Sequence, residues 1–244
     1  MAEPQRVSSS SGKFAETYYD DYVVKMSARN TARTLERTAA VLDLCGAGRG
    51  RLLGVGAGNL SEGLAYKQAG FEVTVVDVTA SLREQAEAAG LRFHQANLET
   101  DPLPGPYDMV CCMEVLEHLL DPLGALKKLA GAAAPGGRLF VSLPEEFHAV
   151  ARLRVLVGRP AFSHYNWPHI RFFNLRAARE LAADAGLQIV AVRHMPLVPP
   201  RMGWLHPLGR LLGRLLPGLF TISHVFELRP AGGAAATSSA NRRL

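Results

Sequence analysis

The stretch from Leu44 to Leu60, LCGAGRGRLLGVGAGNL, contains two runs of closely spaced glycines. The first run extends from Gly46 to Gly50, and the second extends from Gly54 to Gly58. A turn that binds a nucleotide follows a strand and opens a helix, because the glycines let the ligand approach the backbone while the helix N-terminus faces it. The fold and the ligand therefore depend on which run has a strand before it and a helix after it.

The second run has this context and the first does not. Thr31 to Leu44 has the periodicity of a helix, so the first run lies between a helix and a strand. The second run follows the apolar stretch Arg51 to Val55 and precedes a stretch with helical periodicity. In nucleoside-binding folds an acid closes the next strand about 20 residues further on and binds the ribose hydroxyls. Asp77 lies at that point, 21 residues after Gly56, so we expect a nucleoside site between the second run and Asp77.

Short apolar stretches alternate with amphipathic stretches along the chain. The expected strands are Arg51–Val55, Glu72–Asp77, Leu91–Gln95, Tyr107–Cys112 and Arg138–Leu143. The expected helices are Leu60–Ala69, Ala80–Ala89, Pro122–Ala133 and Leu175–Ala185. Two further strands form an expected antiparallel pair at the sheet edge, Leu187–Met195 and Phe220–Arg229. We therefore expect an α/β fold with a doubly wound, mainly parallel seven-stranded sheet that has an antiparallel edge strand.

The length and composition suit one compact domain. The chain has 244 residues, of which 48% are hydrophobic. We expect disordered tails at 1–12 and 231–244, because these segments have few large apolar side chains. The domain between them, 13–230, has expected helical insertions at about 147–170 and 199–217.

Charge and cysteine content indicate the compartment and exclude some partners. Three cysteines, two of them adjacent at Cys111 and Cys112, argue against a disulfide framework and for a reducing cytosol. The first residues lack the apolar core of a signal peptide, and no apolar run approaches the roughly 20 residues of a membrane span. The net charge is +5, and the basic residues form no stripe with stacking aromatics. We expect a cytoplasmic protein that does not bind nucleic acid.

Five segments along the chain point to a known family. The chain contains, in this order, RLLGVGAG, VTVVDVTASL, YDMVCCMEVLEHLLDP, APGGRLFVSLP and HIRFFNLRAARELAADAGL. They resemble the successive motifs of class I S-adenosylmethionine-dependent methyltransferases, and CMEVLEH most resembles the ubiquinone-biosynthesis O-methyltransferase branch. The resemblance covers roughly Phe14 to Arg229. It implies a Rossmann-like methyltransferase fold with S-adenosylmethionine as the cofactor.

The resemblance also implies which residues contact the cofactor. Gly56 and Gly58 match the glycines that lie against its methionine end, and Asp77 matches the acid that binds the ribose diol. The remaining matches are Arg33 near an N-terminal arginine of the branch, Asn97 at the adenine amine and Met113 beside the cofactor after the fourth strand.

Two positions depart from the family pattern. Gly54 stands where the family usually has Asp or Glu, and Leu60 replaces a usual glycine. The missing carboxylate ordinarily helps to hold the ammonium group of the cofactor, through a charge-assisted hydrogen bond of about 1.5 to 3 kcal/mol. We expect weaker cofactor binding, or compensation by Glu62 or Asn59. A non-catalytic cofactor-binding subunit is the alternative that these departures favour.

Polar residues follow the fourth expected strand, where an acceptor would lie. Glu114, Glu117 and His118 share one face if the segment is helical, so they can bind a divalent cation or present a general base. The resemblance implies a Mg-dependent Glu-x-x-Glu-His, which makes all three the candidate ligands of Mg²⁺. The alternative is a helix cap. The candidate catalytic histidines are His118 as the first choice of base, His148 as the second, and His169 as a residue that lines the acceptor pocket in SHYNWPHIRFF.

Two stretches combine apolar with basic residues. Phe147–Phe162 contains three arginines, and Arg201–Leu216 contains Trp204 and several leucines, with Arg210 and Arg214 four residues apart. Helices of this kind lie in a membrane interface or pack on the sheet as a lid. The resemblance favours peripheral membrane contact, because members of the branch touch membranes through an insertion after the fifth strand.

These observations predict an S-adenosylmethionine-dependent methyltransferase that acts on an oxygen of a small hydroxylated acceptor, prenylated or lipid-linked. Methyl transfer needs in-line alignment of acceptor, carbon and sulfur more than covalent work by the protein. A hydroxyl acceptor must also lose its proton to a base or beside a metal. A nicotinamide-dependent oxidoreductase shares the glycine turn but leaves the CMEVLEH segment unexplained.

Overall fold

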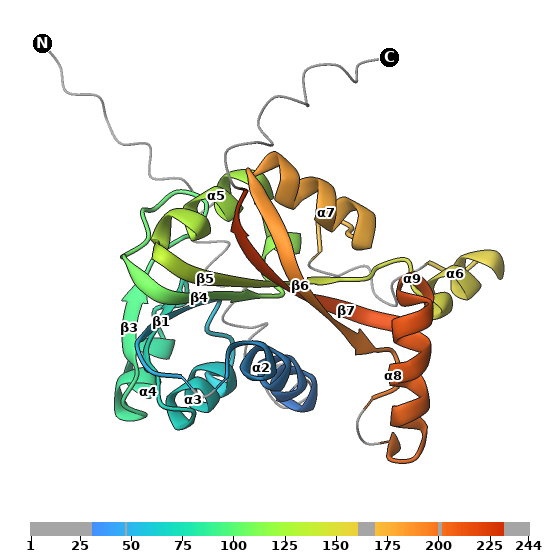
Figure 1. Cartoon of the computed structure of the whole chain (residues 1–244), viewed down its shortest axis with the longest axis horizontal. Helices are drawn as coiled ribbons and strands as arrows, with labels where there is room; N and C mark the ends of the chain where they lie inside the picture. Colours follow the sequence, from blue (N-terminus) through green and yellow to red (C-terminus); the bar gives the residue numbers. More distant parts are fainter. Residues whose placement is uncertain (1–30, 47, 161–168, 200–201, 232–244) are drawn as a thin grey trace, which may run out of the picture.

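The sheet has seven strands in the order β3-β2-β1-β4-β5-β7-β6 (Figure 1). The computed structural model describes residues 31–46, 48–160, 169–199 and 202–231. The strands are β1 (Arg51–Val55), β2 (Glu72–Asp77), β3 (Arg92–Gln95), β4 (Tyr107–Met113), β5 (Ala133–Pro144), β6 (Leu187–Pro196) and β7 (Thr221–Pro230). Neighbouring strands from β3 to β5 are parallel, and β7 runs antiparallel to both β5 and β6. The expected mainly parallel seven-stranded α/β fold is therefore confirmed, with its antiparallel strand next to the edge strand β6.

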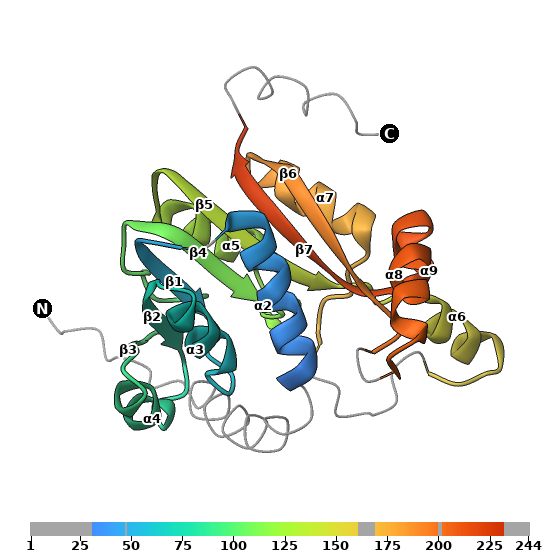
Figure 2. The same ribbon diagram turned by 60° about the horizontal axis from the view of Figure 1, so that its bottom comes forward.

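Helices cover both faces of the sheet (Figures 1 and 2). They are α2 (Thr31–Cys45), α3 (Ser61–Gln68), α4 (Leu82–Ala88), the 3-10 turn η1 (Leu116–His118), α5 (Pro122–Ala132), α6 (Ala149–Leu156), α7 (Leu175–Asp184), α8 (Leu205–Leu215) and α9 (Pro217–Phe220). Tyr66 and Leu82 belong to the core under α2, α3 and α4, whereas Leu126 belongs to the core under α5 and α7. Adjacent residues of a central strand enter opposite cores, as Cys111 and Cys112 do. Burial on both faces explains why these strands are almost continuously apolar.

The carboxyl ends of β1 and β4 lie side by side at the point where the strand order reverses. Leu52 pairs with Met109, and Val55 pairs with Cys112. From β1 the chain moves outward to β2 and β3, and it then returns to β4 on the other side of β1. Ligands of doubly wound sheets bind beside the carboxyl ends of the strands at such a switch point. The loop after β1 and the segment after β4 both begin there.

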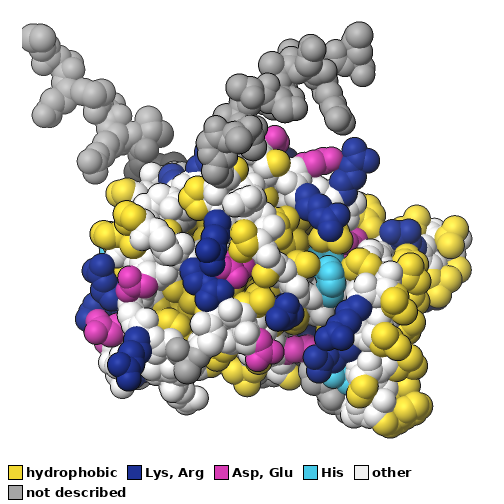
Figure 3. Space-filling model, in the orientation of Figure 1, with side chains coloured by type: hydrophobic (Ala, Val, Ile, Leu, Met, Phe, Trp, Pro, Cys, Tyr) yellow, Lys and Arg dark blue, Asp and Glu magenta, His cyan; other side chains and the backbone are white. Residues whose placement is uncertain are grey.

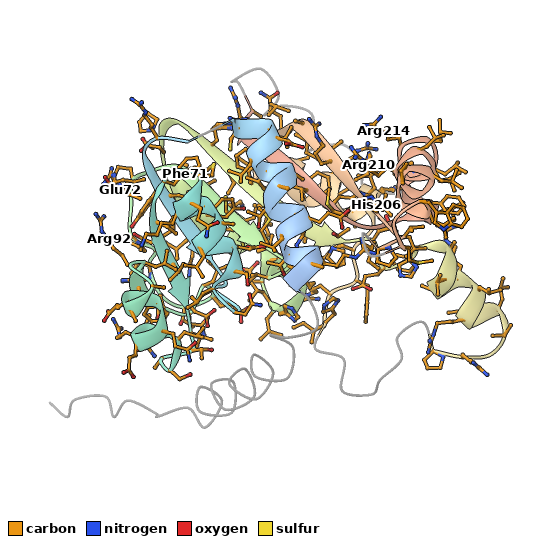
Figure 4. The ribbon with its side chains drawn as sticks, turned by 90° about the horizontal axis from the view of Figure 1, so that it is seen from below. Phe71, Glu72, Arg92, His206, Arg210 and Arg214 are labelled. Carbon is orange, nitrogen blue, oxygen red and sulfur yellow. The ribbon has the colours of Figure 1, made fainter. Side chains whose placement is uncertain are left out.

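The first glycine run lies at the opposite end of β1 and connects α2 to that strand. A Cβ at Gly48 would lie 1.7 Å from Cζ of Phe71, so this glycine permits close packing against the ring that Figure 4 labels. The amide of Arg51 donates a hydrogen bond to Oδ2 of Asp108 at 2.7 Å. The first run is therefore a helix-to-strand connection, and the second run connects β1 to α3, as predicted.

The additional helices lie beyond one end of the sheet (Figures 1 and 2). α6 follows β5, whereas α8 and α9 connect β6 to β7, close to the two expected insertions. Nε2 of His206 in α8 lies 2.9 Å from Oε1 of Glu36 in α2. Among helices of the described ranges, none combines the length and hydropathy needed to cross a bilayer. The expected tails, apart from residue 231, and segment 161–168 of the first insertion lie outside the described residues.

Candidate active site

The glycine loop between β1 and α3 is held against both neighbouring segments. Gly56 has φ +85°, and a Cβ there would lie 2.4 Å from Cγ2 of Val115 in the segment after β4. Its amide donates to the carbonyl of Val76 in β2 at 2.9 Å. Gly58 has φ +51°, and a Cβ there would meet no atom of the described residues within 4 Å. The loop therefore lies at the carboxyl edge of the sheet, and none of the described residues fills the space beside Gly58.

Asp77, at the end of β2, binds the glycine loop directly. Its Oδ2 accepts a hydrogen bond from the amide of Ala57 at 2.7 Å, and its Oδ1 accepts one from the amide of Thr79 at 2.9 Å. Each carboxylate oxygen can accept a further hydrogen bond, so acceptor positions remain for a sugar diol. The hydroxyl of Thr79 is buried and has no hydrogen-bond partner among the described residues. Asp77 and the loop are thus in contact, as the predicted site requires, and Thr79 is a polar group that the sequence did not indicate.

The two departures from the family pattern have different structural consequences. Leu60 has φ +63°, a left-handed conformation that costs a residue with a Cβ about 1 to 2 kcal/mol. Its side chain is only 5% exposed and belongs to the core under α2 and α3. Gly54 needs no such conformation, and a Cβ there would lie 3.9 Å from Leu52 and 4.0 Å from Val75. A Cβ at position 54 would therefore make only ordinary van der Waals contacts.

Arg33, a predicted cofactor contact, lies between α2 and the end of β6, and its role toward the cofactor stays a prediction. Its Nη1 donates to the carbonyl of Pro196 at 2.7 Å, and its Nη2 donates to the carbonyl of Leu197 at 2.9 Å. These bonds, together with an ion pair to Glu36, commit the guanidinium to joining α2 to the end of β6. Arg37 lies one helical turn further along α2 and is the arginine that approaches α3.

Arg37 and Glu62 face each other between α2 and the first turn of α3. Arg37 Nε lies 4.0 Å from Glu62 Oε1, beyond hydrogen-bond distance, and the two side chains are 15% and 18% exposed. Within the described part of the chain, neither atom has a hydrogen-bond partner. Burial raises the pKa of the Glu62 carboxyl to about 7, although Arg37 acts to lower it, and Glu114 adds to the rise. Arg37 Nε and Glu62 Oε1 are therefore buried atoms without the hydrogen bonds that such groups normally make.

Asn97 and Met113 lie near the strand ends on either side of β1. Met113 is 6% exposed and packs in the core under α2 and α3. Asn97 Oδ1 accepts a hydrogen bond from the amide of Glu99 at 2.9 Å. The preceding amide, of Ala96, donates to the main-chain carbonyl of Asp77 at 3.1 Å, so this turn adjoins the ribose-binding candidate. Their roles toward the cofactor stay predictions.

The segment after β4 is not the helix on which the predicted metal ligands depended. β4 ends at Met113, Glu114 has φ +55°, and a single 3-10 turn follows at η1. The hydroxyl of Ser142 donates to Oε1 of Glu114 at 2.8 Å. Glu114 is therefore turned toward β5. The left-handed backbone at this non-glycine residue costs about 1 to 2 kcal/mol, and strain of this kind is frequent at functional sites.

The structure brings together Glu117, His118 and His169, a cluster that shares two residues with the predicted ligand set. One ligand atom from each of these residues lies within 4.8 Å of the other two. The rings of His118 and His169 meet edge to face, with their centroids 4.8 Å apart. His169 Nδ1 is hydrogen-bonded to Oε1 of Glu146, and its Nε2 lies 3.9 Å from Oε1 of Glu117. The fold thus brings two candidate histidines together, replaces Glu114 by His169, and adds Glu146, which the sequence analysis missed.

Glu117 supports this cluster through its main chain and through its side chain. Its carbonyl accepts hydrogen bonds from the amides of Ile170 and Arg171, both at 3.0 Å, which fixes the segment after His169. Its side chain is fully buried, and neither carboxyl oxygen has a hydrogen-bond partner among the residues described. Burial raises the pKa of this carboxyl well above its usual range, and Glu114 adds to the rise.

His148, the second candidate base, begins the helix α6. It is the N-cap of α6, and its Nδ1 accepts a hydrogen bond from the amide of Ala151 at 3.3 Å. Burial lowers the pKa of the imidazole, against the effect of Glu146 and Glu145. A neutral imidazole that accepts at Nδ1 carries its proton on Nε2, so it has no further basic nitrogen. The role of His148 as a base stays a prediction.

Comparison with known proteins identifies the family. Residues 13–192 match a family model described as a methyltransferase domain. The chain belongs to this methyltransferase family. It is 32% identical to a ubiquinone biosynthesis O-methyltransferase of Xanthomonas euvesicatoria over 198 residues, which are 72% of this chain and 77% of the relative. The protein of the same name from Aeromonas salmonicida is 37% identical over 98 residues, so the match spans 37% of this chain and only 40% of that relative.

A solved structure shares the fold of this methyltransferase. The magnesium protoporphyrin IX methyltransferase of Synechocystis, with bound S-adenosylhomocysteine, superposes with a TM-score of 0.59 at 17% identity. The superposition covers 82% of this chain and 83% of that one. Together with the family match, it confirms the class I S-adenosylmethionine-dependent methyltransferase that the motifs implied.

The residues of the methyltransferase at this edge fit S-adenosylmethionine. Asp77 offers carboxylate acceptors to a ribose diol, and the Thr79 hydroxyl beside it is buried without a partner in the described ranges. No atom of the described part of the chain occupies the space that a Cβ at Gly58 would fill. These features would hold the nucleoside against the loop, which is the position that the motif match predicted.

Proposed function

We propose that this methyltransferase transfers a methyl group to a hydroxyl oxygen of a small acceptor. The observation that carries the proposal is the contact of His169 with His118 and Glu146 next to the glycine loop. The segment that bears His118 adjoins this loop, because Val115 lies against the backbone of Gly56. Oxygen as the methylated atom is also supported by the two aligned relatives, which are named as O-methyltransferases.

Removal of the hydroxyl proton is the step that side chains of this protein perform. When bound, S-adenosylmethionine supplies a methyl group that is already electrophilic. His169 donates its Nδ1 proton to Glu146, which leaves Nε2 as the basic nitrogen of the ring. A carboxylate that orients an imidazole in this way also stabilises the imidazolium that forms when the ring takes a proton. We therefore assign the base to His169, with His118 packed against it as the alternative.

A divalent cation at the same cluster is a second way to favour loss of that proton. Glu117, His118 and His169 would be its ligands. Two imidazoles with one carboxylate suit Zn²⁺, Mn²⁺ or Fe²⁺ better than Mg²⁺, which prefers oxygen ligands. The donor set therefore favours a transition metal over the Mg²⁺ that the resemblance implies.

The surface of α8 supports a membrane-borne acceptor. A Cβ at Gly209 would lie 2.8 Å from Val198, and a Cβ at Gly213 would lie 3.2 Å from Thr221, so the glycine side of the helix packs on the protein. The large apolar side chains of the helix are exposed: Trp204 at 83%, Leu208 at 50%, Leu211 at 52% and Leu215 at 66%. Their spacing of three and four residues places them on one side of the helix. A surface helix ordinarily buries its large apolar side chains, so this side requires another partner.

An anionic membrane surface is the partner that fits. α6 adds a second set of exposed apolar side chains, Val150, Leu153, Val155 and Leu156. Figure 3 shows hydrophobic side chains gathered over α6 and α8 on one side of the molecule. Arg210 and Arg214, labelled with His206 in Figure 4, follow one another along α8 and add positive charge beside this surface. Apolar side chains next to arginines suit a lipid interface with anionic headgroups, so the proposed acceptor is prenylated or lipid-linked and is met at the cytoplasmic membrane surface.

The test is a labelling reaction with purified protein. Methyl-labelled S-adenosylmethionine is incubated with an extract of lipids and small molecules, with and without EDTA, and the product is analysed for a methyl ether. Product that EDTA abolishes and Mn²⁺ or Zn²⁺ restores assigns proton removal to the metal, whereas product that resists EDTA assigns it to a histidine of the cluster. Binding of S-adenosylhomocysteine without any labelled product would favour the alternative that Gly54 motivates, a non-catalytic cofactor-binding subunit. Absence of binding would reject the methyltransferase activity.

A further inference from the structure

Glu145 is a buried acid that the proposed proton removal does not use. It follows β5 directly, and its side chain is 1% exposed. Its Oε1 accepts a hydrogen bond from the amide of Phe147 at 3.3 Å, and its Oε2 accepts one from the amide of Leu175 at 3.0 Å. Nε2 of His224, a fully buried residue of β7, lies 3.3 Å from the same Oε2. Because a carboxylate offers only acceptors and all three partners can donate, these contacts suit an ionised Glu145.

The hydrogen bonds of Glu145 connect the two segments that carry the proposed base and its partner. Glu146 is the next residue, and His169 lies six residues before Leu175. The amide of Glu146 donates to the carbonyl of Phe173 at 2.9 Å, which is one link between the segments. The bond from the Leu175 amide to Glu145 is a second link. Two links at successive residues fix the rotation of one segment against the other as well as their separation.

The contact between His169 and Glu146 depends on how firmly these segments are held. Glu146 is hydrogen-bonded to Nδ1 of the imidazole, so its position decides where Nε2 of the same ring points. A displacement of about 1 Å at a catalytic group can lower the rate by about 100-fold. A side chain that orients a base therefore needs partners that hold it in turn. The carbonyl of Glu117 already holds the two residues after His169, and Glu145 links the next part of that segment to the main chain beside Glu146.

His224 directs a proton toward Glu145 because of its contact with His194. The two Nδ1 atoms lie 2.8 Å apart, so one donates and the other accepts. Burial lowers the pKa of His194 to about 4, so this ring is neutral at neutral pH. When His194 donates from Nδ1, the Nδ1 of His224 accepts, and the proton of His224 lies on Nε2. The pair therefore presents a donor to the carboxylate of Glu145.

We propose that Glu145 is a positioning residue for the contact of His169 with Glu146 and that His224 holds Glu145 in that role. Glu145 acts through the main chain beside Glu146 and through the start of α7, without touching the acceptor or the cofactor. The inference rests on the proposed function, because the contact that it positions is the proposed base with its carboxylate. It gives a role in turnover to two buried polar side chains of the β5 and β7 ends.

NMR of the full chain with nitrogen-15 in its histidines tests the orientation of the base without an acceptor. The Nδ1 proton of His169 donates to Glu146 and should give a low-field resonance, which is assigned by its absence in His169→Gln. Leu175→Pro deletes the amide that bonds to Glu145. Proline is well tolerated there, because position 175 is the first of α7 and follows the extended residue Asn174. The resonance should shift or broaden in Leu175→Pro and should stay in place in the matched control Leu175→Ala, which lacks the side chain but keeps the amide.

Turnover separates a positioning role from a purely structural one. Glu145→Gln should lower the initial rate of label transfer to the lipid and small-molecule extract, at saturating S-adenosylmethionine, by about 10- to 100-fold. It should leave the affinity for S-adenosylhomocysteine within about twofold of the wild-type value. The matched control is Glu227→Gln, a buried acid of β7 that is paired with Arg138. This control should lose stability and keep its rate, because Glu227 bonds to neither segment of the base.

The outcomes distinguish this proposal from the proposed function. Equal rates in Glu145→Gln and the wild type, or equal losses in Glu145→Gln and Glu227→Gln, would overturn the positioning role. If Glu145→Gln does not fold, the two Leu175 variants decide, and an unchanged His169 resonance in Leu175→Pro would overturn it. A wild-type spectrum without that resonance would also do so. A wild-type protein that forms no labelled product would instead refute the proposed function, and the NMR comparison does not depend on product.

Discussion

The carboxylate of Asp77 and the amide of Ala57 are joined by a hydrogen bond of 2.7 Å, which fixes the end of β2 to the glycine loop after β1. The second carboxylate oxygen accepts from the amide of Thr79 at 2.9 Å. Asp77 therefore has two roles that can be separated, because it holds the loop in place and presents acceptors to the ribose of the proposed cofactor.

Substitution of Asp77 should affect cofactor binding more than folding. Asp77→Ala should abolish measurable binding of S-adenosylhomocysteine and lower the free energy of unfolding by about 1 to 2 kcal/mol, because two amides lose their acceptor. Asp77→Asn retains one acceptor oxygen, so its stability should lie closer to wild type while its affinity remains low. Calorimetry and urea unfolding measure the two effects. Unchanged affinity in Asp77→Ala would contradict the placement of the ribose.

The His169 assignment predicts a defect in turnover without a defect in cofactor binding. His169→Ala should lower kcat by about 100-fold or more, the usual contribution of a general base, and should leave the affinity for S-adenosylhomocysteine unchanged. His118→Ala should have a smaller effect if His118 only supports the ring. The control is His94→Gln, an exposed histidine of β3. Normal kcat in His169→Ala would exclude His169 as the base, and a larger loss in His118→Ala would return the role to His118.

Much of the fold could be predicted from the sequence because its signals are local. The predicted bounds of β1 and β2 match the structure, since buried parallel strands are continuous apolar runs between turns. β5 begins at Ala133, earlier than the predicted Arg138, because Pro135 and the two glycines after it do not look like a strand. Pairing with β4 from Tyr107 onward nevertheless makes them part of one.

The site was less predictable because its contacts join residues distant in the sequence. Arg33 and Arg37 are one helical turn apart, and the sequence does not show which of them donates hydrogen bonds to the carbonyls at the end of β6. In the structure Arg33 makes these bonds. Likewise, His169 replaces Glu114 in the histidine cluster because the left-handed backbone at Glu114 turns its side chain to Ser142. The glycine loop and Asp77, in contrast, are connected by one short strand–helix–strand unit, and their proximity follows from that unit.

Leu60 provides a test of backbone strain in the glycine loop. Both Leu60→Ala and Leu60→Gly remove a buried side chain and should destabilise the protein by about 2 to 4 kcal/mol. Only glycine also relieves the left-handed backbone, so Leu60→Gly should be more stable than Leu60→Ala by about 0.5 to 1 kcal/mol, although glycine gains more entropy on unfolding. Urea unfolding gives both values. A more stable alanine variant would show that position 60 is not strained.

The exposed apolar side of α8 predicts a specific loss of membrane binding. The double substitution Leu211→Ser and Leu215→Ser should lower the partition coefficient onto phosphatidylglycerol vesicles by about tenfold or more, because two leucines lose a lipid environment. Both side chains are at least half exposed, so unfolding should be unaffected. Val190→Ser, an exposed apolar residue of β6, is the control. Equal vesicle binding by the double variant and the wild type would refute the lipid surface as the partner of α8.

A histidine pair on the last two strands predicts how stability depends on pH. His194 Nδ1 lies 2.8 Å from His224 Nδ1, and His224 Nε2 lies 3.3 Å from Oε2 of Glu145. Burial lowers the pKa of His194 from 6.5 to about 4, and the nearby His224 and Arg179 add to this effect. Between these two pKa values the unfolded chain binds a proton at His194 that the native protein does not bind. The stabilising contribution is therefore complete above pH 6.5 and is lost as the pH falls toward 4.

His194→Gln isolates this contribution from that of other titrating groups. From pH 7 to pH 5 the free energy of unfolding of the wild type should fall by about 1 kcal/mol more than that of His194→Gln. This value is smaller than the shift in pKa alone would give, because His194 is only half-buried and solvent screens its charge. Urea unfolding of both proteins at the two pH values measures the difference. Parallel losses would mean that His194 titrates normally in the native state, and a smaller loss in the wild type would reverse the sign of the predicted linkage. Carboxyl groups with raised pKa values, such as Glu62, stabilise the native protein as the pH falls, which is the opposite effect. Because the wild type and His194→Gln both contain these groups, their contribution cancels when the two proteins are compared.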